Sequence, residues 1–372
     1  MKYIVYADIH HDEHAAKCLT LKDTIEIERQ LFQRAADGGF DFVIFGGDRF
    51  LKREPKDEIK VRADLGLLEG LVKQKPGFAY FHLVGNHDRV DNTLGWHTAV
   101  SLGTQMKTLL ISPGVMTSPG TYNAVDLPVM IHALPAGFQF DASKYALSLT
   151  ENLNLFVFHD IVRGATSDAE GKHVFTEGIP ISDFDLPEFD RVYAGDIHVP
   201  QTFSTKNTKG GYVGAVLQRT RADSNQARGW LEVNAERVND KWTFKTEFVP
   251  TRNFFTRLAF HVNDATTYAE LTAQIDDQWV TDQAVEVRLA GSKANVDRLA
   301  DEPLWQNYTD VVLARRFDIL REYKTGQQAA VVNLSSTQSP SEDLELYIDS
   351  GFADVGDLSS DKLFTILEAA ND

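Results

Sequence analysis

Short apolar runs alternate with amphipathic stretches through the first 250 residues of the chain. Apolar positions at helical spacing predict a helix over about residues 20–37, which ends at Gly38-Gly39, and a second helix near 57–73. Alternation of this kind is typical of an α/β domain. The predicted strands are KYIVYAD (2–8), FDFVIFGGD (40–48), FAYFHLVGNHD (78–88), LPVMIHAL (127–134), LNLFVFHD (153–160) and RVYAGDIH (191–198), followed by antiparallel strands between Gly210 and Pro250.

The pattern changes around residues 249–255. A small α+β domain is predicted after this point, and then residues 325–340, rich in Ser, Thr, Gln and Gly, read as a linker. Two short amphipathic helices, separated by GFADVGD, are predicted within 341–372. The small domain is expected to contain a strand at 257–262, a helix at about 265–276, a strand at 284–291, a helix near 293–300 and a strand at 309–317. The predicted organisation is therefore a domain at 1–250, a second at 251–324, a linker at 325–340 and a helix-loop-helix at 341–372.

Composition narrows the class of protein. Cys18 is the single cysteine, which excludes an internal disulfide framework or a cysteine-based zinc site and fits a reducing compartment. No apolar run approaches the roughly 20 residues needed to span a bilayer. We expect a soluble, cytoplasmic protein, in a bacterial cell or in the host cytoplasm of a virus.

The chain is acidic, with a formal net charge of −17. Residues 251–372 contain 10 Lys and Arg against 21 Asp and Glu. Such a chain will not bind DNA through bulk electrostatics, so a nucleic-acid substrate would need local basic residues, metal ions or a partner. Arg53, Arg219 and Arg221 are candidate phosphate contacts, with a solvated surface as the alternative.

Five predicted strands end in residue types that bind metals. Sites in open α/β sheets form beyond the carboxyl ends of the strands, so these residues are expected at one edge. One such Asp is usually a turn or cap residue, but five strand ends of this kind in one chain indicate a metal centre. Asp196 and His198 flank Ile197 and are expected to point the same way if the strand continues through them. The strand-end residues are Asp8, His10, Asp48, Asn86, His87, Asp88, His159, Asp196 and His198.

The motifs D-x-H, G-G-D, G-N-H-D, H and G-x-x-H, in this order, resemble those of the calcineurin-like metallophosphoesterases. Within that superfamily the chain is most similar to the SbcD-type nucleases of DNA double-strand-break repair. YAGDIHVPQ, FHDIVRGA and YVGAVLQ are similar to segments of that branch. The resemblance covers roughly residues 1–325 and implies a sandwich of two β-sheets flanked by helices, with a small α+β capping domain and a C-terminal helical tail.

The resemblance also implies a site. Asp48 would bridge two divalent metals; Asp8, His10 and His198 would complete one, and Asn86, His159 and Asp196 the other. His87 would face the scissile phosphate as acid or hydrogen-bond donor rather than bind metal. Two metals about 3.5–4 Å apart can activate water and stabilise charge on a phosphate. An oxygen-rich ligand set without cysteine favours Mn²⁺, or Mg²⁺, over softer metals.

Two positions depart from the family pattern. Asp196 stands where the family usually has His, and the shorter, anionic ligand should hold the second metal more firmly and somewhat lower its Lewis acidity. Leu51 stands where the SbcD branch often has His or Asp to orient the catalytic histidine. Some other group must then orient His87, and Asp88 is a weak candidate. His11 is expected to face away from the site, in a loop or at the surface.

Three functions are compatible with these residues. The first is a DNA exonuclease and endonuclease acting at ends or hairpins, as a homodimeric nuclease subunit that binds an SbcC-type coiled-coil ATPase through residues 341–372. The second is another phosphoesterase, although GGDRFLKRE lacks the G-D-x-V-D-R-G motif of phosphoprotein phosphatases. The third is a non-catalytic scaffold that keeps the fold.

Overall fold

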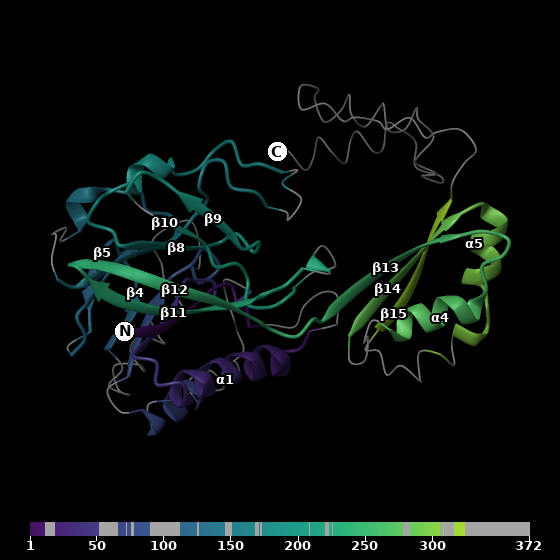
Figure 1. The fold of residues 1–372 in the computed structure, drawn as a ribbon, viewed down its shortest axis with the longest axis horizontal. Coiled ribbons are helices and arrows are strands. Elements are labelled where there is room, and N and C mark those ends of the chain that lie inside the picture. The colour runs from purple at the N-terminus through teal and green to yellow at the C-terminus, as the bar shows by residue number, and fades with distance from the viewer. Residues whose placement is uncertain are drawn as a thin grey trace.

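Two six-stranded sheets form the larger part of the molecule, and a three-stranded sheet forms a smaller part (Figure 1). The structure is a computed structural model that describes residues 1–11, 19–51, 66–71, 73–75, 78–89, 112–124, 126–145, 151–167, 171, 173–207, 209–219, 223–224, 226–277, 283–305, 308 and 316–323. No helix within these ranges is long and apolar enough to cross a membrane.

The first sheet has the order β12-β11-β1-β2-β3-β4, with β1 to β4 parallel and β11 antiparallel to both β1 and β12. Every residue of β2 and β3 is buried, as expected for central parallel strands covered on both faces. Helix α1 begins at the capping box of Thr20 with Asp23 and ends before Gly38. The elements are β1 (Lys2–Tyr6), α1 (Leu21–Asp37), β2 (Phe42–Phe45), β3 (Ala79–Leu83), β4 (Ser112–Met116), β11 (Gly229–Val238) and β12 (Lys241–Pro250).

The second sheet has the order β5-β6-β7-β8-β10-β9. Strands β6, β7, β8 and β10 are parallel, while β5 and β9 are antiparallel to their neighbours. The expectation that the strands from Gly210 onward are antiparallel holds for β11 and β12 and for β10 with β9, but β10 pairs in parallel with β8. The elements are β5 (Gly120–Asn123), β6 (Val129–Leu134), η1 (Ala142–Lys144), β7 (Leu153–His159), η2 (Ile181–Phe184), β8 (Arg191–Gly195), β9 (Gln201–Ser204) and β10 (Lys209–Tyr212).

Alternate side chains of β1 point into two separate cores. Tyr3 and Val5 of β1 lie in the core between the two sheets, with Ile131 and Val157 of the second sheet. Ile4 and Tyr6 point to the opposite face, where helix α1 covers them. The predicted α/β sandwich of two sheets is therefore confirmed.

The smaller sheet is parallel, in the order β13-β14-β15, and helices α4 and α5 pack on one of its faces (Figure 1). Of the strand predicted at 309–317, only residues 316 and 317 are described, and they begin β15, which continues to Tyr323 and pairs along the whole of β14. The segments 52–65 and 324–372 lie outside the described residues, and with them most of the helix predicted near 57–73, the linker and the helix-loop-helix. The elements are β13 (Phe255–Val262), α4 (Tyr268–Asp276), β14 (Ala284–Gly291), α5 (Lys293–Ala300) and β15 (Arg316–Tyr323).

Candidate metal centre

The strand ends of both large sheets meet at one place. Three groups of described side chains have ligand atoms within 4.8 Å of one another: Asp8, His10 and His198; His10, Asp48 and His87; and Asp8, Asp48 and His159. Asn86 and Asp196 adjoin His159, whose Nε2 lies 3.2 Å from Asn86 Oδ1 and 3.8 Å from Asp196 Oδ1. The structure thus brings together all seven residues predicted as ligands and His87, and we call these eight residues the metal-type cluster.

Asp48 lies between two parts of this cluster. Its Oδ1 is 3.3 Å from His159 Nε2, and its Oδ2 is 3.5 Å from His10 Nε2. The two oxygens of one carboxylate therefore face two different imidazoles. This arrangement is compatible with the predicted role of Asp48 as a ligand shared by two cations.

The backbone at the strand ends is unusual. Asp8, His10, Asp48 and Asp196 have φ values of 54°, 47°, 62° and 89°. The left-handed region is uncommon for residues with a Cβ, and such conformations concentrate at functional sites. The other two described non-glycine residues with positive φ, Asn239 and Asp240, form the turn between β11 and β12. The strain is thus concentrated at the predicted ligands.

Positive φ also corrects one expectation. Strand β8 ends at Gly195, so alternation does not extend through Asp196 and His198. His198 contacts the Asp8 and His10 side of the cluster, whereas Asp196 lies near His159. The two side chains serve different parts of the site.

The glycines of the motifs allow the strand ends to approach one another. A Cβ on Gly85 would lie 2.1 Å from Asp48 Oδ1, and one on Gly47 would lie 2.3 Å from His159 Nδ1. A Cβ on Gly195 would lie 2.4 Å from the carbonyl oxygen of Gly46. Glycine is therefore needed at each position for close packing around Asp48 and His159.

The donor atoms fit divalent cations. Asp8 Oδ2 and both ring nitrogens of His10 are buried and have no hydrogen-bond partner among the described residues. Buried polar atoms are normally paired, so unpaired ones in a cluster of carboxylates and imidazoles fit a site for a cation. Carboxylate oxygen and imidazole nitrogen are both ligands of divalent cations in proteins. The individual ligand roles remain predictions.

His159 is oriented by the backbone. Its Nδ1 donates a hydrogen bond of 2.7 Å to the carbonyl oxygen of Gly46, which leaves Nε2 directed at Asn86, Asp48 and Asp196. Metal-binding histidines commonly have their second nitrogen fixed in this way. Nε2 is thus presented as a ligand atom.

His87 is oriented by a group that its sequence neighbours do not reveal. Its Nδ1 lies 2.6 Å from the backbone carbonyl oxygen of Leu51, and its backbone N–H donates to Asp48 Oδ1 at 2.8 Å. The backbone carbonyl of Leu51, rather than a side chain at that position, therefore orients His87. Asp88 instead accepts from the backbone N–H groups of Asp48, Arg49 and Gly85, so it stabilises the loops.

Burial and mutual charge shift the ionisation of the cluster when no metal is bound. Burial, with the charges of Asp48 and Asp196, raises the pKa of Asp8 to about 8. Burial alone would raise the pKa of Asp48, but His159 and His87 outweigh it and hold that pKa below its usual value. The same carboxylates hold the pKa of His159 well above normal, against the effect of burial. The cluster therefore binds protons that a cation would displace.

Burial and the positive charge of Arg219 shift the pKa values of His10 and His198. Both lower the pKa of His10, and they lower that of His198 to about 4. Arg219 Nη1 donates to His198 Nε2 at 3.2 Å, so this predicted phosphate contact lies beside the cluster. Arg53 and Arg221 lie outside the described residues.

His11 corrects another expectation. It is buried rather than exposed, with 2 % of its surface accessible, and it contacts Thr24 and Glu28 of helix α1. It does face away from the metal-type cluster, as predicted.

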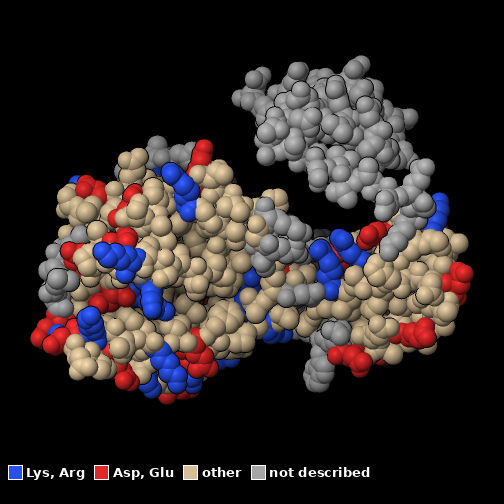
Figure 2. Space-filling model, turned by 45° about the horizontal axis from the view of Figure 1, so that its top comes forward, with Lys and Arg blue, Asp and Glu red and all other residues tan. Residues whose placement is uncertain are grey.

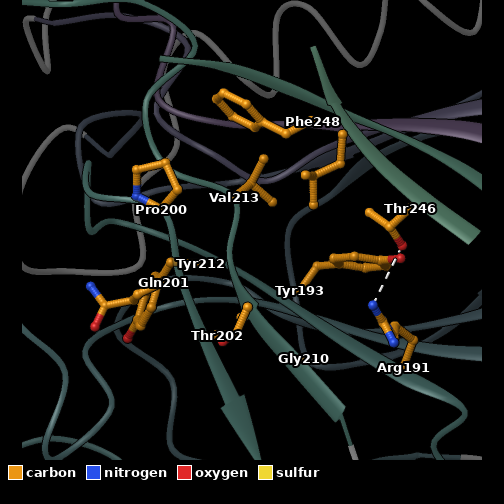
Figure 3. A pocket seen from close by; sticks show the side chains of 12 residues that line it. Arg191, Tyr193, Pro200, Gln201, Thr202, Gly210, Tyr212, Val213, Thr246 and Phe248 are labelled. Atoms are coloured by element: carbon orange, nitrogen blue, oxygen red, sulfur yellow. Dashed lines mark hydrogen bonds between the residues drawn. The ribbon is translucent and has the colours of Figure 1, made fainter. Parts of the chain in front are cut away.

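A separate cavity of about 390 Å³ lies between the two sheets (Figure 3). Arg191 and Tyr193 of β8 line it together with Thr246 and Phe248 of β12. None of the predicted ligands lines this cavity, so it is not part of the metal-type cluster.

Several solved structures are similar to this fold at low sequence identity. The chain is similar to a dimetal phosphatase from Danio rerio (11% identity, 67% of this chain and 96% of the other, TM-score 0.40). It is also similar to the purple acid phosphatase PPD1 of yellow lupin, Lupinus luteus (12%, 63% and 49%, 0.42), and to GAP50, the anchor in the inner membrane complex of Plasmodium (11%, 67% and 84%, 0.40). No family model and no curated protein matches the chain.

Proposed function

We propose that this protein is a metal-dependent phosphodiester hydrolase that cleaves DNA, as the nuclease subunit of a complex with an SbcC-type coiled-coil ATPase. The observation that carries the hydrolase is Asp48, with one oxygen facing His159 and the other facing His10. DNA as substrate, and the ATPase as partner, are supported by the sequence motifs and their order.

The residues divide into two roles. Asp8, His10 and His198 would hold one cation, Asn86, His159 and Asp196 the other, and Asp48 both. Bound divalent cations would supply charge neutralisation on the phosphate and an activated water. His87, held by Leu51 and Asp48, would donate a proton or hydrogen bond to the leaving oxygen. Arg219 would add a positive charge for a non-bridging phosphate oxygen.

A second candidate is a phosphoesterase for a small substrate. The net charge of −17 favours it, as does the face drawn in Figure 2, where Lys and Arg over the larger body are interspersed with Asp and Glu. A DNA nuclease of this charge would depend on its metals, a few arginines and a partner for backbone contacts. We propose that the protein acts in the cytoplasm as a homodimer, and that the ATPase supplies this basic surface.

The test is a set of matched cleavage assays. End-labelled linear duplex, hairpin and single-stranded DNA, and a chromogenic phosphodiester, are incubated with Mn²⁺, with Mg²⁺ and with chelator. Cleavage of DNA with Mn²⁺, weaker cleavage with Mg²⁺ and none with chelator or in Asp48→Ala would support the nuclease. Cleavage of the chromogenic substrate alone, with and without the partner ATPase, would favour the second candidate. Inactivity on every substrate would favour the third function, a non-catalytic scaffold.

A further inference from the structure

A fully buried polar cluster lies behind the metal centre and joins it to helix α1. Glu28 of α1 and Arg49, the residue after Asp48, have no exposed surface, and Arg49 Nη2 donates to Glu28 Oε2 at 2.9 Å. His11, the residue after His10, lies 2.9 Å from the same oxygen through its Nε2. Two residues that directly follow predicted ligands therefore meet on one carboxylate.

Tyrosines from β1 and β3, the strands on either side of β2, complete the cluster. Tyr6 donates to Glu28 Oε1, and its hydroxyl lies 2.9 Å from that of Tyr80. Arg49 Nη1 donates to Tyr80 at 2.9 Å, and its guanidinium lies 5.4 Å above the ring of Phe45. Every one of these side chains is at most 2 % exposed, so we call Tyr6, His11, Glu28, Arg49 and Tyr80 the buried clamp.

The loops that follow β1 and β2 are also joined by their backbones. Asp8 donates to Gly47, His10 to Asp48 and His11 to Arg49, at 3.0, 3.1 and 2.7 Å. These loops carry Asp8, His10 and Asp48, whose left-handed φ values need support from their surroundings. The buried clamp attaches the far end of this paired segment to α1.

We propose that Glu28 and Arg49 are positioning residues that hold Asp48 and His10 at the spacing required for two cations. This inference rests on the proposed function. The charge of Arg49 is fixed opposite Glu28 and faces Tyr80 and Phe45 rather than the cluster, so it acts through the backbone. Groups that orient metal ligands typically change metal affinity by 10- to 100-fold when altered.

Mn²⁺ titration by calorimetry, with electron paramagnetic resonance of the bound ions, tests this directly. Arg49→Met and Glu28→Gln should weaken Mn²⁺ binding by about 10- to 100-fold and reduce the spin coupling that marks a Mn²⁺ pair. Arg49→Lys, which keeps the charge, should recover part of the affinity. Tyr80→Phe removes only one hydroxyl and provides a milder variant if the others do not fold.

The matched control is Leu31→Ala. Leu31 lies on α1, is fully buried in the apolar core and is not part of the buried clamp, so this variant lowers stability alone. It should bind two Mn²⁺ with wild-type affinity and coupling. If it loses affinity as much as Arg49→Met does, or if folded Arg49→Met and Tyr80→Phe keep wild-type affinity and coupling, the positioning role is overturned. A wild-type protein that binds no Mn²⁺ would instead overturn the proposed function, and the positioning role with it.

Discussion

His87 is the residue whose position most directly separates binding from turnover. Two contacts fix it, through the carbonyl of Leu51 and the carboxylate of Asp48, and about a third of its side chain is exposed. Its Nε2 lies 3.9 Å from Asp48 Oδ2. A ring held at the rim in this way can reach a substrate, although it also lies within ligand distance of His10 and Asp48.

His87→Ala tests these two roles. We expect turnover of a phosphodiester to fall by about 10²- to 10⁴-fold, the usual contribution of a general acid, with Mn²⁺ occupancy near that of the wild type. His261→Ala, which removes an exposed histidine of β13, is the control and should change neither. Loss of a metal from His87→Ala would make His87 a ligand.

Asp196 combines a left-handed backbone with a position close to His159. Asp196→Ala should lose the second cation, because it removes a carboxylate from one side of the cluster. Asp196→His should stay active and shift metal preference toward softer ions, because imidazole replaces a hard oxygen ligand. Metal occupancy by plasma emission spectrometry and rates with Mn²⁺, Mg²⁺ and Zn²⁺ provide the comparison. Unchanged occupancy in Asp196→Ala would remove Asp196 from the ligand set.

The shifted pKa values predict a pH-dependent stability of the metal-free protein. The pKa of Asp8 is raised by burial to about 8, and that of His159 is also raised, so above pH 6.5 the folded protein keeps protons that the unfolded chain has released. The free energy of unfolding should therefore fall as pH rises from about 6.5 to 8. Below pH 6.5 the lowered pKa values of His10 and His198 act in the opposite sense and offset the effect of Asp8, so the decline attributable to the cluster is clearest above pH 6.5.

Urea unfolding in chelator at several pH values measures this trend. Asp8→Asn, which cannot titrate, should flatten the decline between pH 6.5 and 8. Added Mn²⁺ should stabilise the protein more at pH 8 than at pH 6, since binding displaces those protons. A metal-free protein equally stable at pH 6.5 and 8 would contradict the predicted ionisation of the cluster.

At the scale of elements, the strands and helices with strong periodicity could be predicted from the sequence. The order of the strands in the sheets was harder to predict. Strand β3 could be recognised because a mostly apolar run precedes Gly85 and Asn86. Helix α1 could be recognised because a capping box precedes it and a glycine follows it. Strand β9 could not, since it is a short edge strand with alternating exposure and no apolar run.

The candidate site shows the same division. Its ligand types and their order are visible in the sequence, because strand ends at one edge of a sheet need only local patterns. The meeting of two sheets, the carbonyl of Leu51 and the contact between His11 and Glu28 depend on tertiary packing. A backbone carbonyl has no signature in the sequence, so no inspection of Leu51 could identify it.

The close approach of strand ends predicts the effect of one methyl group. Gly85→Ala would place a Cβ 2.1 Å from Asp48 Oδ1, so the carboxylate must move away from its two imidazoles. We expect Mn²⁺ affinity to fall by at least 10-fold, measured by calorimetry, because Asp48 contacts both parts of the cluster.

Gly70→Ala is the matched control. Gly70 is helical, and a Cβ there would meet nothing within 4 Å of the described chain. Alanine should stabilise that helix by about 1 kcal/mol and leave metal binding unchanged. Equal Mn²⁺ affinities for Gly85→Ala and wild type would show that Asp48 does not need its observed position.

At the scale of the whole molecule, negative charge is unevenly distributed. Residues 325–372 contain one Lys and nine Asp and Glu, and they lie outside the described residues. Such a segment repels a nucleic-acid backbone, so its value to a nuclease would be in contacts with a protein. Short amphipathic helices are marginal alone in water, and their apolar faces need another surface.

Truncation after Gly326 tests whether this segment docks the ATPase. Cleavage of a small phosphodiester should persist, because every described residue of the metal-type cluster lies within the first 198 positions. Co-purification with the ATPase and ATP-stimulated processing of long duplex DNA should be lost. Leu367→Asp, on the apolar face of the second predicted helix, should reproduce the loss of binding, whereas Glu368→Ser on its polar face should not. A truncated protein that binds the ATPase with unchanged affinity would place the docking surface within the folded domains.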